Sequence, residues 1–212
     1  MKDKRPQKAV PVTAVGTLPR RAAIHRKTRE TDVQLFLDLD GRGAAEVSTK
    51  IGFLDHMLTS WAVHAGFDLK VDAKGDLHVD PHHTVEDVGI VLGDGLNQAL
   101  GDKRGIARFG HAYVPLDEAL TRCVIDLSGR PFLYWDATFP VPQVGALPCE
   151  LFEDFFRAFA DHGRLNLHLE VLRGRNAHHI AETLFKAAAR ALAAAVALDP
   201  RAKGVPSTKG VL

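Results

Sequence analysis

The motif His-His-x-x-Glu occurs twice, at His82–Glu86 and, ninety-six residues later, at His178–Glu182. The flanking sequence repeats as well, since HAGFDLKV, which begins at His64, aligns with HGRLNLHL, which begins at His162. A motif that recurs together with its context is expected when one supersecondary unit has been duplicated. The chain is therefore predicted to fold as two similar halves.

Hydrophobic periodicity predicts the same order of elements in both halves. The first half is expected to contain a hairpin of strands 31–39 and 44–50, a helix at 54–65, strands at 67–71 and 77–80, and a helix at 82–100. The second half is expected to contain strands at 120–127 and 132–137, a helix at 149–162, a strand at 165–171 and a helix at 178–198. This pattern predicts an α+β fold of two duplicated β-β-α-β-α halves, in which each sheet is covered by helices in two layers. The Ala-rich last helix suits close packing at the centre.

Composition supports one compact catalytic unit behind a short tail. Residues 1–22 are rich in Lys, Arg and Pro without amphipathic periodicity and are expected to form a flexible basic tail, followed by half-repeats at 23–110 and 111–212. A formal net charge of +1 gives no reason to expect nucleic acid or a membrane as partner. Two cysteines far apart, and the lack of an apolar signal-peptide segment, favour the cytoplasm.

The two histidine motifs indicate metal chemistry. On a helix, His82 and Glu86 share one face, whereas His83 lies about 100° further around the axis. One ion cannot easily bind both neighbouring histidines, so each motif is expected to serve two metal centres, which could lie across a subunit boundary. A single copy could be no more than a polar helix start, but the second copy favours metal. Imidazole and carboxylate ligands leave Mn, Fe, Zn, Co and Ni open, and neither HExxH nor a paired-cysteine zinc motif occurs.

Two further residues are candidate ligands in the preceding helices. His56 stands 26 residues before the first motif, and Asp154 stands 24 residues before the second. A histidine near a helix start is often only a polar cap, but beside these motifs His56 is interpreted as a ligand. The carboxylate of Asp154 could bind metal at the corresponding place.

Several cations and hydroxyl groups lie beside turns and could hold a phosphate group. They are Arg108, Arg130, Lys186, Ser207, Thr208 and Lys209. Each alone could be an ordinary solvated side chain. Neither GxGxxG nor GxxxxGK[ST] occurs, so a small phosphorylated metabolite is favoured over a nucleotide. Glu30, just before the first predicted strand, is a candidate acid or base.

The ordered motifs GFLDHML, DPHHTVEDVGI, RFGHAYVPLDEAL, DLSGRP, NAHHIAETLFKA and PSTKGVL resemble the imidazoleglycerol-phosphate dehydratase family from Arg26 to Leu212. The resemblance implies a lyase of histidine biosynthesis that removes water from imidazole glycerol phosphate to give imidazole acetol phosphate. It further implies two Mn²⁺ per active site, a metal-bound imidazolate as electron sink, and a fold like domain 2 of ribosomal protein S5. It also implies a homo-oligomer of 24 chains with metals between subunits.

The same resemblance assigns roles to individual residues. The implied metal ligands are His56, His82, His83, Glu86, His178, His179 and Glu182, with Asp154 where the family often has histidine. The implied catalytic residues are Glu30, as proton shuttle, with His56, Glu86 and Glu182. The implied substrate or phosphate contacts are Glu30, His64, Arg108, Arg130, Lys186, Ser207, Thr208 and Lys209.

Two other functions are compatible with the same residues. A metal-dependent hydrolase of a small phosphate ester would release free phosphate, and a storage shell organised by metal would have no activity. The storage shell leaves Glu30 and the phosphate-binding cations without a role. A fused histidinol-phosphate phosphatase, seen in some relatives, is not expected, so the chain is predicted to have one activity.

Overall fold

The computed structural model describes residues 19–202 and 204–212, so most of the expected tail lies outside the described residues. The first half contains β1 (Arg21–Lys27), β2 (Thr31–Asp38), β3 (Ala45–Ser48), α1 (Gly52–Ala65), β4 (Asp68–Gly75) and α2 (His82–Leu100). The second contains β5 (Phe109–Leu116), β6 (Ala119–Asp126), β7 (Phe132–Asp136), β8 (Gln143–Val144), β9 (Leu147–Pro148), α3 (Leu151–Gly163), β10 (Asn166–Arg173) and α4 (Ala177–Val196). The predicted α+β fold with two repeated halves is confirmed.

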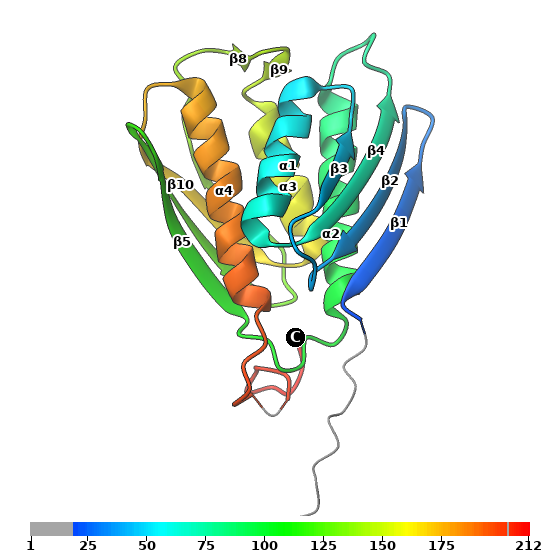
Figure 1. Cartoon of the computed structure of the whole chain (residues 1–212), viewed down its shortest axis with the longest axis vertical. Helices are drawn as coiled ribbons and strands as arrows, with labels where there is room; N and C mark the ends of the chain where they lie inside the picture. Colours follow the sequence, from blue (N-terminus) through cyan, green and yellow to red (C-terminus); the bar gives the residue numbers. More distant parts are fainter. Residues whose placement is uncertain (1–18, 203) are drawn as a thin grey trace, which may run out of the picture.

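The two halves have the same strand topology. The first sheet has the order β1-β2-β4-β3 and the second has the order β5-β6-β10-β7. In each sheet the last strand listed pairs in parallel and the other pairs are antiparallel. The two sheets flank the four helices, so the inner face of each sheet packs on helices (Figure 1).

The predicted hairpin of residues 31–39 and 44–50 is wrong. Strand β2 pairs with β1 and β4, and β3 pairs with the far side of β4. The carboxylate of Asp68, at the start of β4, accepts hydrogen bonds from the backbone N–H groups of Arg42 and Ala44. These bonds hold the loop that contains Arg42 and Ala44 against the start of β4. The chain therefore continues to the far side of β4 and does not turn back beside β2.

Four strands were missed, namely β1, β5 and the two-residue strands β8 and β9, and one predicted strand is a turn. Strand β1 begins at Arg21 inside the expected tail, and β5 begins the second half at Phe109. Both are edge strands with alternating exposed residues, which gives them little apolar signal. Residues 77–80 form a turn, because the N–H of Val79 bonds to the carbonyl of Asp76 and the side chain of Asp80 caps the N–H of His82.

The core lies where the helices of the two halves meet. Helix α2 packs against α3, and α1 packs against α4, so each contact joins the halves. At the first contact, a Cβ added to Gly89 would lie 2.6 Å from the carbonyl oxygen of Phe155. At the inner face of the second sheet, a Cβ on Gly110 would come within 2 Å of the carbonyl oxygen of Ala191 in α4. The small residues therefore set how closely these elements approach, as expected for the Ala-rich last helix.

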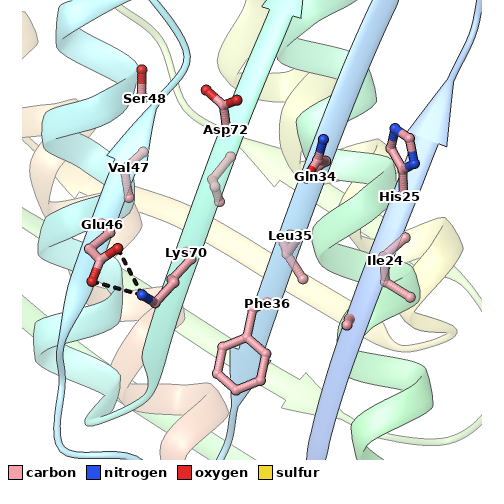
Figure 2. Close-up of a pocket in the computed structure, with 12 residues that line it drawn as sticks. Ile24, His25, Gln34, Leu35, Phe36, Glu46, Val47, Ser48, Lys70 and Asp72 are labelled. Atoms are coloured by element: carbon pink, nitrogen blue, oxygen red, sulfur yellow. Dashed lines mark hydrogen bonds and ion pairs between the residues drawn. The ribbon is translucent and has the colours of Figure 1, made fainter.

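The outer faces of the two sheets differ in chemistry. The first carries polar side chains, including the ion pair of Lys70 with Glu46 at 2.8 Å, around a shallow hollow (Figure 2). The second carries exposed aromatic residues. The ring of Tyr134 stacks on that of His168, with 5.5 Å between the ring centroids. The exposed large hydrophobic residues of this sheet are Phe109, Tyr113, Val124, Phe132, Tyr134 and Leu172. Among the described residues, no helix combines the length and apolar character that a membrane span requires.

Candidate functional site

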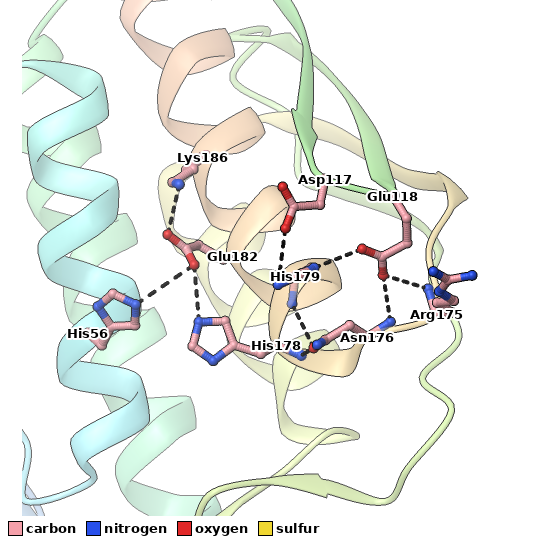
Figure 3. A network of polar contacts seen from close by, with 9 residues as sticks. All are labelled: His56, Asp117, Glu118, Arg175, Asn176, His178, His179, Glu182 and Lys186. Atoms are coloured by element: carbon pink, nitrogen blue, oxygen red, sulfur yellow. Dashed lines mark hydrogen bonds and ion pairs between the residues drawn. The ribbon is translucent and has the colours of Figure 1, made fainter.

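A cluster of two histidines and a carboxylate joins α1 to α4 (Figure 3). His56 comes from the second turn of α1, while His178 and Glu182 stand one turn apart on α4. The carboxylate of Glu182 lies 3.1 Å from Nε2 of His178 and 3.9 Å from Nε2 of His56. The three possible ligand atoms lie within 4.8 Å of one another. Two imidazoles and a carboxylate are a donor set that suits Mn²⁺ and other divalent transition metals.

Lys186 completes the polar network around this cluster. Its ammonium group lies 2.7 Å from the second oxygen of Glu182, one helical turn further along α4. Burial opposes ionisation of Glu182, but Lys186, His178 and His56 outweigh it and lower the pKa of the carboxyl group. His64 lies at the end of α1, where burial and the charges of Lys186 and Arg190 lower its pKa. Near neutral pH, the carboxyl group of Glu182 is therefore ionised and the imidazole of His64 is neutral.

The second pair of helices brings two of the three corresponding residues together, with an acid in place of one histidine. His82 begins α2 and Asp154 lies in the first turn of α3, with 3.6 Å between Nδ1 and the carboxylate. Glu86 is exposed one turn after His82, as Glu182 follows His178. A cleft lined by His82, Asp154, Trp135 and other residues opens beside this pair. Asp154 thus occupies the place that His56 occupies in the other pair, as the spacing predicted.

The other histidine of each motif faces a different way. The rings of His82 and His83 are turned 80° apart, and those of His178 and His179 are turned 87° apart. His83 Nδ1 lies 3.0 Å from Asp76 and 3.9 Å from Glu30. The hydrogen bond to Asp76 raises the pKa of His83. The second histidine of each motif therefore has a carboxylate partner of its own, Asp76 for His83 and Glu118 for His179.

His179 is held by a carboxylate that the sequence analysis missed. Glu118, in the turn between β5 and β6, lies 2.8 Å from His179 Nδ1 and accepts the backbone N–H groups of Arg175 and Asn176 (Figure 3). These bonds lower the pKa of Glu118 to about 2. Asn176 in turn caps α4 by accepting the N–H groups of His178 and His179. The repeat contained a signal for Glu118, because it corresponds to Glu30 in the first half.

The predicted phosphate contacts other than Lys186 gather elsewhere, near the end of the chain. Arg108 forms two hydrogen bonds with Asp126, at 2.7 and 3.1 Å, and donates to the carbonyl of Pro206 at 2.8 Å. It thereby holds the segment that contains Ser207, Thr208 and Lys209. A Cβ on Gly129, beside Arg130, would lie 2.6 Å from the last residue, so this loop also packs against the chain end.

These residues and the histidine clusters lie at opposite ends of α4 (Figure 1). His178 begins the helix, whereas the backbone N–H of Arg108 bonds to the carbonyl of Ala195 in its last turn. At 1.5 Å per residue, the two ends are separated by roughly 25 Å. Lys186 and His64 lie between them. Lys186 lies 2.7 Å from Glu182, but one chain does not bring the other predicted phosphate-binding cations and hydroxyl groups next to its own histidine clusters.

Together, the fold and the site define a duplicated α+β enzyme in which a cluster of two histidines and a carboxylate can hold a metal ion. The family model for imidazoleglycerol-phosphate dehydratase matches residues 49–192. The chain belongs to the imidazoleglycerol-phosphate dehydratase family, whose members are hydro-lyases of histidine biosynthesis.

Individual relatives agree over almost the whole chain. The dehydratases of Gluconobacter oxydans and Phenylobacterium zucineum are 61% and 58% identical, in alignments that cover 91% and 92% of this chain and 98% and 100% of theirs. Solved structures of the family are similar in fold. The Staphylococcus aureus dehydratase has a TM-score of 0.77 at 38% identity, covering 84% of this chain and 99% of its own. The Pyrococcus furiosus dehydratase has a TM-score of 0.78 at 35% identity, covering 89% and 100%.

Proposed function

We propose that the chain dehydrates D-erythro-imidazole glycerol phosphate to imidazole acetol phosphate at a site with two Mn²⁺ ions shared between subunits. The observation that carries this proposal is the cluster of His56, His178 and Glu182. The contact of His82 with Asp154, one helical turn before Glu86, supports a second ion at the corresponding place. The remaining histidines of the motifs, His83 and His179, face other directions and would bind the ions of neighbouring clusters. When bound, Mn²⁺ would stabilise the imidazolate form of the substrate ring and so provide the electron sink for removing water.

Glu30 is the residue that we assign as proton shuttle. It lies in the turn between β1 and β2, is 55% exposed, and stands 3.9 Å from His83. In this position its carboxylate can accept a carbon-bound proton of the substrate and supply a proton to the departing hydroxyl group, which leaves as water. The enol that remains gives the ketone of the product by tautomerisation.

The phosphate group of the substrate would be bound by the cluster at the other end of the helices. Direct contacts to the phosphate would come from Arg130, Ser207, Thr208 and Lys209. Arg108 supports the segment 207–209 through its hydrogen bond to the carbonyl of Pro206. Because this cluster lies roughly 25 Å from the histidines of its own chain, the complete site requires residues from more than one subunit. Lys186 and His64, which lie between the ends, would contact the substrate from the metal side.

A homo-oligomer follows from this division of the site, and we propose a shell of 24 chains. The exposed aromatic face of the second sheet offers a surface for contacts between copies, since large apolar patches commonly mark interfaces. The two cysteines are buried and unpaired, which agrees with a cytoplasmic location.

The proposed activity is tested with metal-stripped protein. Turnover of imidazole glycerol phosphate is measured with and without added Mn²⁺, and product and free phosphate are followed together. Imidazole acetol phosphate that forms only with Mn²⁺ supports the proposal. Free phosphate as the main product would favour the hydrolase instead.

The role of Glu30 is tested with Glu30→Gln. The amide cannot transfer a proton, so kcat is expected to fall by about 10²- to 10⁴-fold. Binding of Mn²⁺ should change little, because His83 already has Asp76 as its hydrogen-bond partner. Activity close to that of the unsubstituted enzyme would remove Glu30 from the mechanism.

A further inference from the structure

The two halves use corresponding glutamates in different ways. Glu30 directly precedes Thr31, the first residue of β2, and Glu118 directly precedes Ala119, the first residue of β6. Each glutamate thus occupies the same turn of its half and faces the second histidine of a motif. The duplication therefore offers an internal comparison of one position in two environments.

In the second half, the carboxylate of Glu118 is fully engaged. One oxygen lies 2.8 Å from His179 Nδ1, and the other accepts the backbone N–H groups of Asn176 at 2.8 Å and Arg175 at 3.1 Å. The side chain is only 25% exposed. Glu118 is thus fixed in place and has little freedom to exchange protons with a substrate.

In the first half, another residue makes the contact with histidine. Asp76 lies 3.0 Å from His83 Nδ1, whereas Glu30 remains 3.9 Å away and 55% exposed. The Asp76 side chain is 15% exposed, and its other oxygen is buried without a hydrogen-bond partner among the described residues. Burial of that oxygen is unfavourable, so the bond to His83 is the evident reason for an acid at this position.

Resting on the proposed metal site, we propose that Asp76 and Glu118 are positioning residues for His83 and His179, and that Asp76 leaves Glu30 free for the substrate. An ionised carboxylate only accepts hydrogen bonds, so Nδ1 of each histidine must carry the proton. The lone pair of Nε2 is then available to a metal ion, in the arrangement by which outer carboxylates orient metal-binding histidines. Asp76 and Glu118 thus both fix the tautomer and orientation of a histidine, although they come from different parts of their halves.

The first test is Glu118→Gln. The amide oxygen can keep the two backbone bonds of Arg175 and Asn176, but its NH₂ group then faces His179 Nδ1. Two donors cannot pair, so the ring is driven to the tautomer with a proton on Nε2. Mn²⁺ affinity, measured through the electron paramagnetic resonance signal of free Mn²⁺, is expected to fall by about 10- to 100-fold. The unfolding temperature of the metal-free protein should stay close to that of the unsubstituted chain.

The matched control is Asp117→Asn. It removes one negative charge from the same turn, but Asp117 is 77% exposed and stands 3.9 Å from Nε2 rather than bonding to Nδ1. A smaller loss of affinity than in Glu118→Gln is expected. Equal losses in the two variants would show that only charge matters and would overturn the positioning role.

The second test compares Asp76→Ala with Asp76→Asn. Alanine leaves His83 without its acceptor, and Glu30 is the carboxylate that can move in, so both Mn²⁺ affinity and kcat should fall. Asparagine can still accept the Nδ1 proton and should restore most of the affinity. Equal affinities for the alanine and asparagine variants would refute the inference. Failure of the unsubstituted protein to bind Mn²⁺ would instead refute the proposed function.

Discussion

Gly89→Ala is expected to destabilise the protein, although the same change usually favours a helix. The new Cβ would lie 2.6 Å from the carbonyl oxygen of Phe155, whereas ordinary contacts begin near 3.4 Å. Helices α2 and α3 must therefore separate by roughly 0.8 Å, and such overpacking costs about 1–3 kcal/mol. Replacing glycine by alanine in a helix stabilises the folded state by at most about 1 kcal/mol through helix propensity. A net loss of up to about 2 kcal/mol follows, because the obstacle is a backbone carbonyl and cannot rotate away.

The assay is urea unfolding of metal-free protein at equal chain concentrations, since oligomers and bound metal shift apparent stability. Gly52→Ala is the control, because Gly52 is also helical and its added Cβ meets nothing within 4 Å. This variant should be unchanged or stabilised by up to about 1 kcal/mol. Equal stability of the two variants would refute the packing argument. Since Asp154 adjoins Phe155, Gly89→Ala should also weaken Mn²⁺ binding at the His82 cluster more than at the His56 cluster.

Two further predictions concern metal removal and pH. Chelation at neutral pH should give smaller oligomers on a sizing column, because the metals that we propose between subunits would stabilise the assembly, and unchanged elution would contradict this. The hydrogen bonds to His179, Asn176 and Arg175 lower the pKa of Glu118 from 4.5 to about 2. Its stabilising contribution is therefore complete above pH 4.5 and is lost as the pH falls through about 2. Glu118→Ala should be less stable than the unsubstituted chain in urea at pH 6, and this difference should disappear near pH 2; a constant difference would contradict it.

The sequence predicted what repeats and missed what depends on contacts between distant segments. The helices that carry His82 and His178 followed from hydrophobic periodicity, and the correspondence of Asp154 with His56 followed from motif spacing. The path of β3 past β4 could not be predicted in this way. It depends on a hydrogen bond to the carboxylate of Asp68 from the backbone of Ala44, which lies 24 residues earlier in the chain. Likewise, nothing local to Glu118 indicates His179, which lies 61 residues further along the chain.

The separation of the phosphate contacts from the histidine clusters along α4 has a genetic consequence. A chain with His178→Ala keeps its phosphate-binding residues intact, and a chain with Arg130→Ala keeps its metal-binding residues intact. If sites form between chains, a mixed assembly contains some sites built from the intact end of each. Two inactive alleles expressed together should then restore growth without histidine, although neither does so alone.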